Sequence, residues 1–188
     1  MRKLAVFNNV SLDGYFTDKN NDMSWVHQDP ADSEWNEFVA GNASGGGMLL
    51  FGRVTYDLMA SFWPTPRAAK TMPEVAEGMN KLPKVVFSRT MDRAAWNNTT
   101  LVKDDLTVVV RKLKNQPGPD MVILGSGSIV AQLAREGLID EYQFALVPVV
   151  LGGGRTMFEG IKEKLALKLT GSRVFGNGNV FLRYEPVV

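Results

Sequence analysis

Short runs of apolar residues recur along the chain, and small or polar residues follow most of them at once. Met48–Phe51, Lys84–Phe87 and Met121–Leu124 have the length and aliphatic character of buried strands. Leu4–Val10 predicts another strand, although its two asparagines are unusual in a buried strand and favour a site at the strand's end. Leu101–Val102 predicts one more short strand.

Segments with the apolar spacing of helices lie between these strands. Asp105–Lys114 has apolar residues at i, i+3, i+4 and i+7, which predicts a helix although its central valines would also suit a strand. Apolar residues from Ile129 to Leu138 suit one helical face, and Gly137 is placed to end that helix. Further helices are predicted around Tyr56 and, after a proline-rich loop, up to Lys81.

The first helix has a strong start signal in Asp29-Pro30-Ala31-Asp32. Asp29 suits the N-cap, Pro30 the first turn, and Asp32 favours the positive end of the helix dipole. The glycine- and serine-rich run Gly41–Gly47 is expected to end this helix.

The C-terminal part of the chain changes to a period of two. Leu165, Leu167 and Leu169 alternate with other residues, and Val180, Leu182 and Tyr184 do the same beyond a turn at Gly176–Asn179. This pattern predicts a β-hairpin. Strand–helix units followed by a hairpin predict an α/β fold with a mostly parallel sheet, covered on both faces, in one domain over residues 1–188.

Composition narrows the function classes. A net charge of +1 gives no electrostatic case for binding nucleic acid or an anionic membrane. The absence of cysteine excludes disulfides, thiolate metal sites and a cysteine nucleophile. His27 is the only histidine, which leaves no partner imidazole for a histidine metal cluster, and we expect it in a surface loop. The sequence therefore predicts a soluble, cytoplasmic protein without a metal site.

Three of the predicted strands end in small residues, at Gly52-Arg53, Ser88-Arg89 and Gly125–Ser128. In open α/β sheets, ligands bind outside the carboxyl ends of the strands. Glycine turns that lead into helices direct N–H groups and the positive helix end at an anion. Arginines at two of the junctions suit a nucleotide phosphate, including a 2′-phosphate. A plain tight turn remains the alternative for the Gly125–Ser128 stretch.

Taken in order, Phe51–Tyr56, Val85–Arg89 and Ile123–Val130 resemble the NADPH-binding segments of the dihydrofolate reductase superfamily. Two further stretches resemble one branch of it, the reductase domain of riboflavin biosynthesis and its stand-alone relatives. They are Ser11–Gly14 and the region from Gly137-Leu138-Ile139-Asp140-Glu141 to Leu151–Gly154. The resemblance covers essentially the whole chain.

The resemblance implies a dihydrofolate-reductase-like three-layer fold, with an eight-stranded sheet and NADPH lying across the strand ends. We also expect a small-molecule substrate and a homodimer, and the net charge of +1 predicts neither nucleic acid nor a membrane as a partner. Carried over by position, the resemblance puts Gly52, Arg53 and Thr55 beside the cofactor's phosphates. Ser88 and Arg89 then fall near the adenosine 2′-phosphate, and the pyrophosphate lies over Gly125, Ser126, Gly127, Ser128 and Ile129.

The catalytic group is harder to assign. Met23–Trp25 and Pro30–Asp32 resemble the segment in which dihydrofolate reductases keep their active-site carboxylate, which would make Asp32 the proton-relay group. Asp32 could instead serve only the helix N-terminus. Asp13 is a second candidate carboxylate, for which a turn aspartate is the simpler interpretation.

The resulting hypothesis is an NADPH-dependent reductase of a small heterocycle of the pterin or riboflavin-precursor type. Two alternatives stay open: a non-catalytic NADP-binding protein that retains the fold, and a Rossmann-type dehydrogenase. The second has little support, because Val130 stands where the third fingerprint glycine belongs and little chain follows it. Only Arg67 and Lys70 supply positive charge between Phe62 and Met79, which favours a substrate other than a ribose phosphate.

Overall fold

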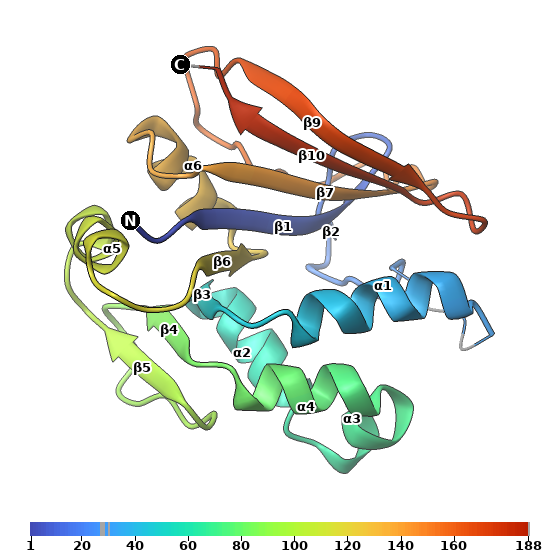
Figure 1. Ribbon diagram of the computed structural model, residues 1–188, viewed down its shortest axis with the longest axis horizontal. Coiled ribbons are helices and arrows are strands. Elements are labelled where there is room, and N and C mark those ends of the chain that lie inside the picture. The colour runs from blue at the N-terminus through green and yellow to red at the C-terminus, as the bar shows by residue number, and fades with distance from the viewer. Residues whose placement is uncertain (27–28, 30, 188) are drawn as a thin grey trace.

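The centre of the molecule is an eight-stranded sheet (Figure 1) in a computed structural model that describes residues 1–26, 29 and 31–187. From one edge to the other the strands are β5 (Thr99–Val102), β4 (Lys84–Phe87), β3 (Met48–Gly52), β6 (Met121–Leu124), β1 (Leu4–Ser11), β7 (Glu141–Val147), β10 (Val180–Pro186) and β9 (Leu167–Val174). The six strands β5, β4, β3, β6, β1 and β7 run parallel to one another. β10 and β9 form an antiparallel hairpin, and β10 pairs with β7. The predicted α/β class with a C-terminal hairpin is confirmed.

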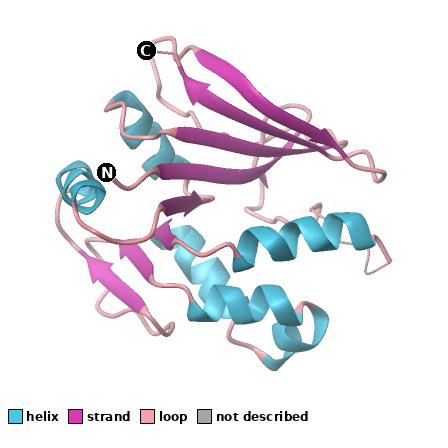
Figure 2. Ribbon diagram, in the orientation of Figure 1, coloured by secondary structure: helices cyan, strands magenta, loops and turns pink. Residues whose placement is uncertain are grey.

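Helices cover both faces of the sheet (Figure 2). They are α1 (Ser33–Ser44), α2 (Arg53–Phe62), α3 (Pro66–Thr71), α4 (Pro73–Lys81), α5 (Leu106–Asn115) and α6 (Gly127–Arg135). On one face, Leu50 and Ile123 pack with apolar residues of α5 and α6. The alternate residues Leu49 and Phe51 turn the other way, to a second core with α2 and α4. Alternation along β3 therefore supplies two cores from one strand.

The first helix begins later than the sequence predicted. Its N-cap is Asp32, whose Oδ1 accepts a hydrogen bond from the Trp35 N–H at 3.0 Å. The assignment of the cap to Asp29 was wrong, because that carboxylate closes a local turn with the Ala31 N–H instead. Pro30, which the sequence placed in the first turn, lies outside the described residues.

The glycine-rich run Gly41–Gly47 ends α1, as the sequence predicted. The helix passes through Gly41 to Ser44 and ends at Gly45. Near this end α4 approaches closely, since a Cβ on Gly78 would lie 2.6 Å from the Ala43 carbonyl oxygen. Small residues here allow the two helices to pack closely. Part of the run therefore belongs to α1 and contacts α4, and the rest forms the turn that follows.

A two-stranded ribbon, which the sequence did not predict, lies beside the main sheet. In it β2 (Thr17–Asp18) pairs antiparallel with β8 (Gly154–Arg155). A side chain at Gly154 would collide with the Thr17 carbonyl oxygen, and its φ of +151° is one that glycine tolerates. The ribbon fixes the backbone position of Arg155. Within the described part of the chain, no helix is both long and apolar enough to cross a membrane.

Candidate functional site

Hydrogen bonds tie the loop after β3 to the loop after β6. The Gly52 N–H donates to Ser126 Oγ at 2.8 Å, and the Ser126 N–H donates to Thr55 Oγ1 at 3.0 Å. Ser126 and Thr55 are only 6% and 8% exposed. A Cβ on Gly125 would lie 2.8 Å from Thr55 Cγ2, so this glycine also permits the contact. The two strand-end loops therefore form one braced unit.

The brace holds two helix N-termini side by side. α2 follows its N-cap Gly52, which has no side chain, and α6 follows its N-cap Ser126, whose side chain does not bond to its own helix. β3 and β6 are neighbours in the sheet, so both helices begin at the same edge. The first N–H groups of a helix lack partners within it, and with the helix dipole they favour an anion. The arrangement can bind phosphate groups.

A cleft of about 490 Å³ opens at these strand ends. Eight of the ten residues predicted to bind a cofactor line it: Gly52, Arg53, Thr55, Ser88, Arg89, Ser126, Ser128 and Ile129. Gly125 lines the neighbouring cavity instead. Gly127 lines neither, because its backbone packs against the segment after β8, where a Cβ would lie 2.8 Å from the Thr156 carbonyl oxygen.

The charges of the cleft are mostly positive. Arg53 donates from Nη1 to Thr90 Oγ1 at 2.6 Å, and its Nε lies 3.5 Å from Asp57. Arg89, Lys103 and Arg155 also line the cleft and form no ion pair with the described residues. The cleft also contains two carboxylates, Asp104 and Asp105, and the second is the N-cap of α5. Lys103 and Arg155 were missed from the sequence. Lys103 follows no glycine or serine junction, and the glycines that precede Arg155, Gly152–Gly154, were not counted among the site residues.

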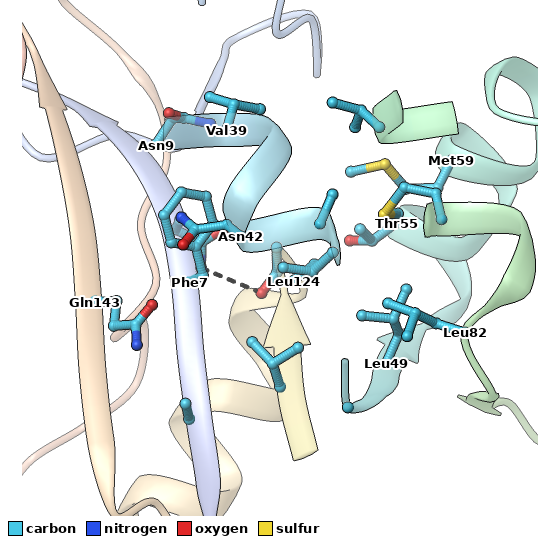
Figure 3. Close-up of a pocket in the computed structure, with 18 of the residues that line it drawn as sticks. Phe7, Asn9, Val39, Asn42, Leu49, Thr55, Met59, Leu82, Leu124 and Gln143 are labelled. Carbon is cyan, nitrogen blue, oxygen red and sulfur yellow. Dashed lines mark hydrogen bonds between the residues drawn. The ribbon is translucent and has the colours of Figure 1, made fainter. Parts of the chain in front are cut away.

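A second cavity of about 500 Å³ lies on the other side of the braced loops (Figure 3). Its wall is largely apolar and comes from the face of the sheet and from α1, α2 and α4. Leu49, Met59 and Leu82 lie together on one side in Figure 3, opposite Phe7 and Gln143. Phe16, Val54, Thr55 and Arg155 line both this cavity and the cleft. The two spaces therefore adjoin.

Amides supply much of the polar lining of the cavity. Asn9 comes from β1, Asn42 from α1 and Gln143 from β7. Asn9 Oδ1 is buried and has no hydrogen-bond partner in the described part of the chain, and the same holds for Oγ1 of Thr17, which also lines the cavity. Buried polar groups in native proteins are almost always paired, which makes unpaired ones at a cavity wall candidates for a ligand contact. These residues were not predicted as site residues, although the asparagines of the first strand had drawn attention.

The two carboxylates considered from the sequence lie outside both spaces. Asp32 caps α1, and its Oδ2 accepts from Asn177 Nδ2 at 2.7 Å, in the turn between β9 and β10. Asp13 accepts from Ser11 Oγ and from the N–H groups of Leu151 and Gly152. The Ser11 hydroxyl, followed by these N–H groups, lowers the pKa of Asp13. This is the turn aspartate that the simpler interpretation described.

No carboxylate among the described residues lines the cavity near the cleft. Lys3, Asp120 and Glu141 line it at the opposite end, where β1, β6 and β7 begin. No three acidic or histidine side chains of the described residues are grouped so as to hold a metal ion. His27, which the sequence placed in a surface loop, lies outside the described residues.

Comparisons with known proteins agree with this architecture. Residues 2–181 match the family described as the RibD C-terminal domain. YyaP of Bacillus subtilis (strain 168) is 31% identical over 176 residues, which cover 94% of this chain and 90% of YyaP. YwjB of the same organism is 25% identical over 178 residues, with 93% of each chain covered. Both relatives are described as uncharacterized.

Solved structures are similar over the whole chain. A protein of Shewanella sp. PV-4, described as a candidate riboflavin biosynthesis protein, has a TM-score of 0.78 at 25% identity, with 99% of each chain covered. RibD of Acinetobacter baumannii has a TM-score of 0.68 at 18% identity. A deaminase/5-amino-6-(5-phosphoribosylamino)uracil reductase of Thermotoga maritima has 0.67 at 14%. This chain covers 59% and 57% of those two longer proteins, and at such identities the likeness concerns the fold.

Proposed function

Since the chain belongs to the RibD C-terminal domain family, we propose that it is an NADPH-dependent reductase of a small heterocycle of the pterin or riboflavin-precursor type. The family and its reductase-like fold support the general reaction class. The cofactor and the substrate class are our inference from the cleft and the cavity. The alternative is an NADP-binding protein of the same fold without turnover.

The observation that carries the proposal is that a cationic cleft adjoins an apolar cavity. A dinucleotide needs cations and free N–H groups for its phosphates, and the cleft supplies both. Its nicotinamide must reach a drier space, and the cavity begins at the shared residues Val54 and Thr55. The walls of that cavity are apolar enough to exclude much water from a bound ring.

The residues of the cleft fit NADPH. The N–H groups at the starts of α2 and α6 would hold the pyrophosphate, with Arg53 nearby, and Ser88 and Arg89 would hold the 2′-phosphate. When bound, the cofactor would supply the hydride. The chain's own residues would orient the substrate ring in the cavity and keep water from it. The described residues offer no acid at that place, so we expect water to supply the proton.

Two measurements test the proposal. Calorimetric titration should show NADPH binding more tightly than NADH, by roughly tenfold or more, because a charge-assisted phosphate contact contributes about 1.5–3 kcal/mol. Arg89→Gln should reduce that preference, and Arg111→Gln is the matched control, because Arg111 pairs with Glu136 outside the cleft. Equal affinities for the two cofactors would remove the 2′-phosphate assignment.

The second measurement separates an enzyme from a binding protein. NADPH oxidation should be followed at 340 nm with a panel of pterins, flavins, pyrimidinediones and quinones. We expect at least one compound to be reduced in stoichiometric amount. Tight NADPH binding with no oxidation across the panel would favour the non-catalytic alternative.

A further inference from the structure

The side-chain oxygen of Asn9, Oδ1, is buried and has no hydrogen-bond partner among the described residues. Asn9 lies on β1, two residues before the end of the strand, and belongs to the lining of the apolar cavity. An unpaired buried carbonyl oxygen costs free energy that the folded protein does not recover by itself. Thr17 Oγ1 is unpaired in the same wall. The cavity therefore contains hydrogen-bonding groups that no group of the described residues satisfies.

A carboxamide has one acceptor oxygen and a donor NH₂ group side by side. Its complement is a group with an N–H next to a carbonyl, because two parallel hydrogen bonds can then form. A cyclic lactam or imide edge has this pattern, and the surrounding walls of Phe7, Leu124 and Met59 suit the flat faces of the same ring. Asn9 is thus matched to a lactam edge, whereas an ester or a simple quinone offers only acceptors and would leave the Asn9 oxygen unpaired.

Charge in the cavity limits what else the ligand can contain. Two cationic side chains of the described residues line it, Lys3 and Arg155. Lys3 is exposed and lies six residues before Asn9, which is about 20 Å along an extended strand at roughly 3.3 Å per residue. Arg155 lies at the junction with the cleft, where the phosphates of a dinucleotide would engage it. A phosphate on the second ligand would therefore be desolvated without a cation of its own.

From these observations we infer that Asn9 is the specificity-determining residue for a phosphate-free heterocycle, which it recognises through a lactam or imide edge. The inference rests on the proposed reductase function and names the substrate class of the same site. A phosphate-free substrate would distinguish this chain from a reductase that acts on phosphoribosyl compounds. The Arg67 and Lys70 side chains do not alter this conclusion, because neither lines the cavity.

Binding of defined probes to the intact protein tests the inference. Riboflavin, FMN and 3-methylriboflavin share one ring system, and they differ by a phosphate or by a methyl group on the imide nitrogen. Lumazine and 1,3-dimethyllumazine repeat the methyl comparison on a smaller ring, in which both N–H groups must be blocked to remove every lactam edge. Fluorescence titrations use protein saturated with NADP⁺, after NADPH binding has been verified by calorimetry. We expect riboflavin or lumazine to bind, and FMN and both methylated compounds to bind at least about tenfold more weakly.

Variants assign the effect to Asn9. Asn9→Leu keeps the size of the side chain and removes both hydrogen bonds, so binding of the unmethylated probe should fall roughly 10- to 100-fold. The methyl discrimination should disappear with it. Because Asn9 Oδ1 has no hydrogen-bond partner to lose among the described residues, the variant should melt at or above the parent's temperature. Asn115→Leu on α5 is the control, since Asn115 bonds only within its own helix.

The possible results separate the two proposals. A protein that fails to bind NADPH contradicts the proposed function itself. A protein that binds NADPH but binds none of the probes, or binds FMN as well as riboflavin, contradicts the assigned substrate class. Asn9→Leu that binds the probes as the parent does, or that unfolds at a clearly lower temperature, contradicts the role given to Asn9.

Discussion

At the scale of single residues, buried charge is the feature with the clearest consequence. Lys84 is only 1% exposed. Its ammonium donates to the carbonyl oxygens of Asn80, Leu82 and Asn97 at 3.2, 2.7 and 3.2 Å, and it lies 4.5 Å from the centre of the Trp96 ring. Burial lowers the pKa of Lys84 to about 8. The residue joins α4 to the chain before β5 and must lose most of its hydration to do so.

The lowered pKa of Lys84 predicts how stability depends on pH. An unfolded lysine titrates near 10.4, so between about pH 8 and pH 10 the unfolded chain binds more protons than the folded one. The free energy of unfolding should therefore rise with pH over this range, by at most roughly 1.4 kcal/mol per pH unit from this group. Denaturant titrations of the parent and of Lys84→Met should show this rise in the parent alone. If the free energy of unfolding changed with pH equally in both proteins, Lys84 would have the same pKa in the folded and the unfolded chain.

Asp32 is predicted to act in folding. Its carboxylate caps α1 and also binds Asn177 of the hairpin turn, and it lines neither the cleft nor the cavity. Asp32→Ala should lower the free energy of unfolding by about 0.5–2 kcal/mol, the usual loss of an N-cap. Asp32→Asn should lose much less, because asparagine caps helices as well as aspartate does. A large loss of turnover in a stable Asp32→Asn protein would contradict this prediction and would support a role for Asp32 in proton transfer.

At the scale of elements, the brace between the loops after β3 and β6 determines whether the cleft keeps its shape. Ser126 accepts from Gly52, and Thr55 accepts from Ser126, so each hydroxyl satisfies an N–H that is shielded from water. The sequence predicted both junctions, because glycine and serine at strand ends are a local signal. It did not predict that they bond to each other, because the two loops are more than 70 residues apart in the chain.

Breaking the brace should destabilise the protein and weaken the cofactor site. Ser126→Ala and Thr55→Val each leave an N–H unpaired, which should cost about 1–3 kcal/mol in the free energy of unfolding. The double variant should cost less than the sum, because both hydroxyls hold the same pair of loops. Ser128→Ala, in the first turn of α6 but outside the brace, should change stability by less than about 0.5 kcal/mol. Full additivity in denaturant unfolding would show that the two bonds act independently.

Other elements mark the limit of prediction from local pattern. The late start of α1 was missed because Asp29-Pro30 has the residue types of a helix start, and only the contact of Asp32 with the hairpin turn favours the later cap. The ribbon of β2 and β8 was missed because two-residue strands have no periodicity to detect. That ribbon nevertheless positions Arg155, so part of the site could not be predicted from local sequence.

At the scale of the whole molecule, the strand order brings the cleft and the cavity together. β1 lies between β6 and β7, so Asn9 and Gln143 line one cavity with residues of α1 and α2. The cleft could be predicted, since its residues follow successive strands at one edge of the sheet. The cavity could not, because its lining comes from separate segments between Lys3 and Arg155, and only the folded sheet joins them.

Arg155 is predicted to couple the two spaces. It lines both of them and forms no ion pair with the described residues, whereas Arg89 lines only the cleft. Arg155→Gln should weaken NADPH binding by roughly tenfold or more, the loss of one charge-assisted contact. We expect bound NADP⁺ to change the affinity for riboflavin, because Arg155 lies in the walls of both sites and can contact both ligands. Arg155→Gln should make this change in affinity smaller.

The comparison with Arg89→Gln makes this prediction specific. That variant should weaken NADPH binding without changing riboflavin affinity once the cofactor site is saturated, because Arg89 does not reach the cavity. Reciprocal titrations supply an internal check: NADP⁺ must raise riboflavin affinity by the same factor by which riboflavin raises NADP⁺ affinity. If Arg155→Gln leaves that factor unchanged, the coupling passes through the other residues of the shared wall, Phe16, Val54 and Thr55.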